Sequence, residues 1–113
     1  MTDLYLIVHE RTVRNCETVG IPGAEVALAE IERIKREEEF LEFTIPSSLA
    51  MHPELPPPSD DLTIAVLGAY KELCVFNQHY LLEMQGYNVQ YHLPGCVSVC
   101  DDEGAFFALA NNF

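Results

Sequence analysis

Four stretches of the chain have the hydrophobic pattern of β-strands. Residues 4–8 and 62–67 are short apolar runs bounded by polar residues, which is typical of strands buried on both faces. Residues 40–45 and 87–93 alternate between apolar and polar side chains, which is typical of strands with one exposed face. The pattern therefore predicts four strands.

Three further stretches have the pattern of helices. Apolar residues recur at helical spacing in residues 24–38, and again between a turn at residues 68–70 and Gly86, a residue that often follows a helix end. A last helix is predicted from Asp102 to about Ala110, because three acids stand at its start, where the helix dipole favours them. The apolar stripes of the first two helices are Ala24, Ala27, Leu28, Ile31 and Ile34, and then Leu73, Phe76, Tyr80 and Met84.

The remaining stretches are predicted to be connections. Residues 11–19 are polar and without a clear period, and we expect a loop there. Residues 46–61 hold five prolines, which indicates a stiff surface loop within a single domain of residues 1–113, since neither side is long enough for its own core. Pro94-Gly95 indicates a turn, followed by a short extended piece over residues 96–100.

Strands that alternate with helices predict an α/β fold with three layers: a mostly parallel sheet of about four strands, with helices on both faces. The expected strand order is second, first, third, fourth. Ligands of such sheets bind beyond the carboxyl ends of the strands, where the connections diverge. His9, Glu10 and Arg11 follow the first strand. Residues 68–74 follow the third strand, so we expect a small-molecule ligand between these two segments.

Composition excludes several classes of function. The chain has 113 residues and a net charge of −12, which argues against binding to nucleic acid or to anionic membranes, because both require a basic surface. The first residues have the features of neither a signal peptide nor an anchor, so we expect a cytoplasmic protein with reduced cysteines. No pair of cysteines has CxxC spacing, and we expect neither a metal nor a cofactor.

Cys74 lies near the start of the second predicted helix. The positive end of the helix dipole favours the thiolate at such a position. A cysteine after a strand and a tight turn is therefore a candidate nucleophile. The alternative is a small buried side chain that packs under the turn.

Residues 68–75 (GAYKELCV) and the following 86–89 (GYNV) resemble the isochorismatase-like cysteine hydrolases, as does the tail from Cys96 to residues 105–109. The resemblance implies an isochorismatase-like, Rossmann-like fold, a nucleophile at Cys74 and a cis peptide between Ala69 and Tyr70. It also implies an aspartate at the end of the first strand, where this chain has His9. The lysine of the family's triad has no counterpart in residues 43–48, and Lys71 stands where the family has threonine.

Two functions remain open at this point. In the first, the chain has lost the hydrolase triad and acts as a small-ligand-binding or homo-oligomeric assembly protein. A small sheet with few covering elements exposes apolar surface that an oligomer would bury, and the contact candidates are Phe106, Phe107 and Phe113, unless one or two of them pack in the core. In the second, the chain cleaves an amide-type C–N bond with Cys74 as nucleophile and His9 as base. The expected binding residues are Glu10, Arg11, Ala69, Tyr70 and Lys71.

Overall fold

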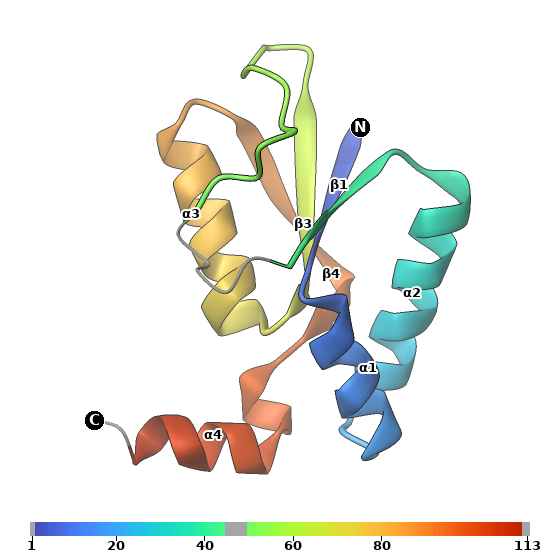
Figure 1. The fold of residues 1–113 in the computed structure, drawn as a ribbon. Helices are drawn as coiled ribbons and strands as arrows, with labels where there is room; N and C mark the ends of the chain where they lie inside the picture. The colour runs from blue at the N-terminus through green and yellow to red at the C-terminus, as the bar shows by residue number, and fades with distance from the viewer. Residues whose placement is uncertain (1, 45–49, 112–113) are drawn as a thin grey trace.

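The structure, a computed structural model, describes residues 2–44 and 50–111 and contains a four-stranded parallel sheet (Figure 1). Its strands have the spatial order β2-β1-β3-β4, which is the predicted order. Their bounds are β1 (Leu4–Val8), β2 (Phe40–Phe43), β3 (Thr63–Ala69) and β4 (Asn88–Val97). The predicted α/β fold with a parallel sheet is therefore confirmed.

Helices cover both faces of the sheet (Figure 1). One face carries α1 (Glu10–Thr18) and α2 (Ala24–Glu37), and the other carries the π-helical turn η1 (Lys71–Val75) and α3 (Phe76–Met84). After β4 come the 3₁₀ turn η2 (Val99–Asp101) and α4 (Glu103–Ala110). None of the described helices is both long enough and apolar enough to span a membrane.

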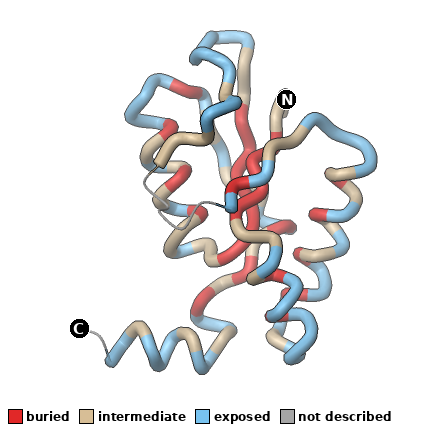
Figure 2. Tube along the Cα trace, viewed as in Figure 1, coloured by how far each residue is buried: buried red, intermediate tan, exposed pale blue. Residues whose placement is uncertain are grey.

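Two apolar clusters, one on each face of the sheet, form the core (Figure 2). Successive residues of β1 alternate between them, since Ile7 belongs to the cluster under α2 while Leu6 and Val8 belong to the cluster under α3. The predicted stripe of α2 is buried at Ala24, Ala27, Ile31 and Ile34. The sequence pattern thus identified the residues that pack α2 onto the sheet. The stripe predicted for the next helix was wrong, because Phe76, Tyr80 and Met84 are exposed and the buried residues of α3 are Gln78 and Leu82.

The prediction of a loop at residues 11–19 was wrong, because this stretch forms α1. Its inward face holds only two buried residues, Val13 and Cys16, so the helical period is short and faint. An ion pair between Glu10 and Arg14, one helical turn apart, supports the outer face, with Oε2 and Nε separated by 2.7 Å. The spacing of these two opposite charges is the feature of the sequence that indicated a helix in this stretch.

The predicted turn at Pro94-Gly95 was also wrong, and the extended piece predicted at residues 96–100 was right only as far as Ser98. Strand β4 continues through both residues to Val97, and its register with β3 shifts between Val66 and Gly68. Such an irregularity accommodates a proline on an edge strand. Gly95 is needed there because a Cβ at this position would collide with the side chain of Leu67. Residues 99–101 form η2, so the chain turns five residues later than expected.

The proline-rich segment lies partly outside the described residues, at 46–49. Residues 50–61 contain no helix or strand. Met51 and Leu55 pack against the core cluster under α3, and the Tyr87 hydroxyl donates a hydrogen bond to the carbonyl of Pro56 at 2.5 Å. This part of the segment is therefore held against the body of the protein.

Candidate functional site

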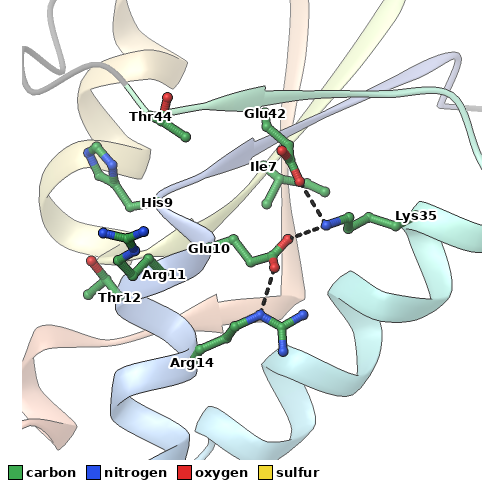
Figure 3. A pocket seen from close by; sticks show the side chains of 9 residues that line it. All are labelled: Ile7, His9, Glu10, Arg11, Thr12, Arg14, Lys35, Glu42 and Thr44. Carbon is green, nitrogen blue, oxygen red and sulfur yellow. Dashed lines mark hydrogen bonds and ion pairs between the residues drawn. The ribbon is translucent and has the colours of Figure 1, made fainter.

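A pocket of about 700 Å³ lies at the carboxyl ends of β1 and β2, beside the start of α1 (Figure 3). It contains the three side chains predicted to follow the first strand, His9, Glu10 and Arg11. The remaining predicted site residues, Ala69, Tyr70, Lys71 and Cys74, do not line it. Its full lining is Ile7, His9, Glu10, Arg11, Thr12, Arg14, Lys35, Glu42 and Thr44.

One wall of the pocket is a chain of ion pairs between α1, α2 and β2 (Figure 3). The carboxylate of Glu10 accepts from Lys35 Nζ at 2.9 Å and from Arg14 Nε at 2.7 Å. Lys35 Nζ also lies 2.8 Å from Glu42 Oε1. Burial raises the pKa of Glu10, but the hydrogen bonds from Lys35 and Arg14 outweigh it and leave this pKa below its usual value. Glu10 is therefore ionised near neutral pH and remains paired with both cations.

The opposite side of the pocket holds His9 and Arg11. His9 adopts a left-handed backbone conformation, with φ 53° and ψ 58°, at the residue that caps α1. Its N–H donates to the carbonyl of Phe43 at 3.0 Å, and its ring meets the Phe43 ring edge-on with centroids 5.9 Å apart. These contacts turn the imidazole toward Thr44 and away from Glu10 (Figure 3).

Partial burial lowers the pKa of His9 below 6.5, so its imidazole is mainly neutral at pH 7. Arg11 is exposed and forms no ion pair with any residue in the described parts of the chain. This side of the pocket thus offers a neutral imidazole and an uncompensated guanidinium.

The pocket concentrates positive charge. The whole chain has six basic residues against eighteen acidic ones, yet three of the six, Arg11, Arg14 and Lys35, line this pocket. The carboxylates among the lining residues are only Glu10 and Glu42. The lining therefore carries a net charge of about +1, in a protein whose net charge is −12.

Cys74 lies elsewhere, in η1 on the α3 side of the sheet. It is half-buried and packs against the core cluster that contains Val75 and Leu82. Within the described residues, its thiol makes no hydrogen bond to His9. Lys71 is the first residue of η1, and its Nζ lies 3.9 Å from Glu72 Oε2. Both residues line a second hollow. The peptide bond between Ala69 and Tyr70 is cis, at the position that the resemblance implies.

Tyr70 points to the α1 face of the sheet. Its hydroxyl donates to Asp102 Oδ2 at 2.6 Å and lies 3.7 Å from the thiol of Cys16. Burial, and then the hydrogen bond to Asp102, raise the pKa of Tyr70 far above its usual value. The same bond is the main cause of a lowered pKa at Asp102. Tyr70 therefore connects β3 to the start of α4 rather than lining the pocket of His9.

Arg14, Lys35 and Glu42 are candidate site residues that the sequence prediction did not include. A signal existed for Arg14, which follows Arg11 by three residues and so shares its side of a helix. No local signal exists for Lys35, because only the packing of α2 against α1 and β2 brings it to the pocket.

The described residues contain no group of three or more His, Cys, Asp or Glu side chains arranged to hold a metal ion. Compared with models of protein families, with curated proteins and with solved structures, the chain shows no significant match.

Proposed function

We propose that the protein is a small-ligand-binding protein on an isochorismatase-like fold, without hydrolase chemistry, and that its ligand is a small anion. The observation that carries the proposal is the gathering of three of six basic residues around one pocket in a strongly acidic chain. A volume of about 700 Å³ lies within the range of small-molecule sites, roughly 300–1,000 Å³. The lost triad positions, with His9 in place of aspartate and no lysine in residues 43–48, agree with a loss of catalysis.

Arg11 is the principal anion contact in this proposal. A guanidinium presents a planar fork of donors that matches a carboxylate or phosphate group. Lys35 is already shared by two carboxylates, whereas Arg11 has its full charge available. The neutral imidazole of His9 adds one donor or acceptor, and the start of α1 adds the partial positive charge of a helix N-terminus. Thr12 and Thr44 add hydroxyl groups that complete a polar ligand's hydrogen bonds.

Calorimetric titration with inorganic phosphate, succinate and benzoate tests the proposal. We expect at least one of these anions to bind, and Arg11→Ala to weaken that binding at least tenfold, as for the loss of a charge-assisted hydrogen bond. The matched control is Arg36→Ala, which removes the same charge from an exposed site on α2 outside the pocket. No binding at 10 mM of any probe, or equal effects of the two substitutions, would refute the proposal.

The alternative is a cysteine hydrolase with Cys74 as nucleophile and His9 as base. Its support is the half-buried thiol at the first turn after β3. The same preparation distinguishes the two, by peptide-resolved alkylation of Cys74 and of the exposed Cys100. A binding protein should show slower reaction at Cys74 than at Cys100. Faster reaction of Cys74 at pH 6, together with an acyl adduct from an activated amide, would favour the hydrolase.

A further inference from the structure

Helix α4 presents apolar side chains to solvent. It contains no buried residue, and its residues 104–110 (GAFFALA) carry no charge. Phe106 and Phe107 are 49% and 69% exposed, so neither of them packs in the core, whereas Phe113 lies outside the described residues. Only Ala105 and Leu109 are half-covered among the described residues of this helix. In Figure 1, α4 extends away from the sheet and the other helices.

A second exposed apolar surface lies on α3 and β4. Phe76, Tyr80 and Met84 recur every four residues on α3 and are all about half exposed or more. The rings of Phe76 and Tyr80 stack at 6.2 Å. Beside them is a hollow of about 450 Å³, which we call the α3–β4 groove, lined by Lys71, Glu72, Phe76, Tyr91 and Leu93. The two charges of this lining, Lys71 and Glu72, cancel each other.

The groove adjoins the base of α4 in the same molecule. Glu72 lines the groove, and its carboxylate accepts hydrogen bonds from the Ser98 hydroxyl and from the N–H of Val99 at 2.8 Å, just before α4. The start of α4, however, is drawn to the α1 face by the bond between Tyr70 and Asp102. The helix therefore leaves its own groove uncovered.

We infer that the occupant of this groove is α4 of a second copy of the chain, in a two-fold dimer that exchanges the two helices. Each copy carries one helix and one groove, so a single two-fold operation satisfies both surfaces and closes the assembly. Phe107 is the residue that enters the groove, where it meets Phe76 and Leu93. This inference is independent of the anion pocket, which lies at the far edge of the sheet, between β1 and β2.

The available area and the charge both fit a dimer. The six exposed side chains of α4, α3 and β4 present about 700 Å² per copy, taking roughly 200 Å² for each fully exposed large side chain. A standard interface buries about 800 Å² per partner. Because each copy has a net charge of −12, two copies repel each other least where the facing surfaces carry no net charge. Residues 104–110 and the groove provide one.

Sedimentation equilibrium of the full chain between 1 and 300 μM tests the dimer. We expect the wild-type mass to approach twice 12.7 kDa, and Phe107→Glu to raise the dissociation constant at least 30-fold, as for a central aromatic contact. The matched control is Val26→Glu, which places the same charge at a 63% exposed position on α2 and should leave the dimer intact. Circular dichroism checks that each variant is folded.

A complementation experiment tests the pairing itself. Phe107→Lys and Leu93→Glu should each give monomers, whereas an equimolar mixture should form a heterodimer. In that heterodimer one groove keeps its apolar contact and the other gains a pair of opposite charges. A wild-type monomer at 300 μM, equal disruption by Val26→Glu, or a mixture that stays monomeric would each overturn the inference.

Discussion

Replacing Tyr70 by phenylalanine tests how α4 is attached to the rest of the protein. The substitution keeps the ring and removes only the hydroxyl, which donates to Asp102 at 2.6 Å. Asp102 caps α4, because its other oxygen accepts from the N–H of Ala105 at 3.2 Å. Loss of the hydroxyl should therefore leave the Asp102 carboxylate less firmly held and destabilise the first turn of α4.

The expected cost is about 1 kcal/mol in the free energy of unfolding. A hydrogen bond to a charged group contributes roughly 1.5–3 kcal/mol when it is buried. Tyr70 and Asp102 are only half-buried, so solvent screens the bond and reduces its contribution to about 1 kcal/mol. For a chain of this size, about 1 kcal/mol corresponds to a fall of about 4 °C in Tm.

The cost should also depend on pH. The folded-state pKa of Asp102 lies below its usual value of 3.8, so the unfolded chain binds the proton more tightly than the folded one. The stabilisation is fully present above about pH 4 and is lost as the pH falls through the folded-state pKa. The difference between wild type and Tyr70→Phe should therefore be constant from pH 5 to 7 and shrink below pH 4.

Urea denaturation at several pH values measures this difference, and hydrogen exchange of α4 measures its local part. Tyr80→Phe is the control, since the Tyr80 hydroxyl makes no hydrogen bond within the described residues and is on the exposed stripe of α3. Equal unfolding free energies for the two variants at every pH would refute the conclusion that the Tyr70 hydroxyl holds the start of α4 in place through Asp102.

Two further substitutions test the sheet and the pocket wall. Gly68→Ala should cost several kcal/mol and lower Tm sharply, because Gly68 has φ +122° and an added Cβ would collide with the backbone of Val8. The control Gly104→Ala, where the nearest side-chain atom is 3.7 Å from the added Cβ, should be neutral or slightly stabilising. Similar Tm values for the two variants would contradict the reasoning. Glu10→Gln should cost about 0.5–1 kcal/mol at pH 7, because it removes one of the two carboxylate partners of Lys35 and the ion pair with Arg14. The difference should be lost as the pH falls through the lowered pKa of Glu10, and a difference by urea denaturation that is as large at pH 2 as at pH 7 would exclude the charge as its cause.

Most of the fold could be predicted because its strands are strongly patterned. Continuous apolar runs at β1 and β3 required burial on both faces, and the alternation of strands with helices then fixed a parallel order. Helix α1 was not predicted because two buried residues in nine do not establish a period. The path of β4 was not predicted because its continuation past Pro94 depends on a register shift against β3, which leaves no local pattern in the sequence.

The candidate site could be predicted only in part. His9, Glu10 and Arg11 follow a strand directly, so topology alone brings them to a carboxyl end. Lys35 lies on a helix whose inward face is apolar, and its contact with Glu10 and Glu42 depends on how α2 packs. The position of Cys74 at a helix start made it a candidate and the resemblance added Tyr70, but the structure directs these side chains to two different faces of the sheet.

The net charge of the chain argues against binding of an anion, whereas the charge of its pocket favours it. Which of the two matters depends on how far the protein's charges lie from the ligand. A net charge of −12 opposes nucleic acid, because a polyanion contacts the surface over many ångströms and meets the acids there. A small anion contacts only the lining. At physiological ionic strength, charges more than about 8 Å away are largely screened, so the ligand is affected mainly by Arg11, Arg14 and Lys35 and by the two carboxylates beside them. The proposed site for a small anion is therefore compatible with an acidic surface that disfavours large polyanions.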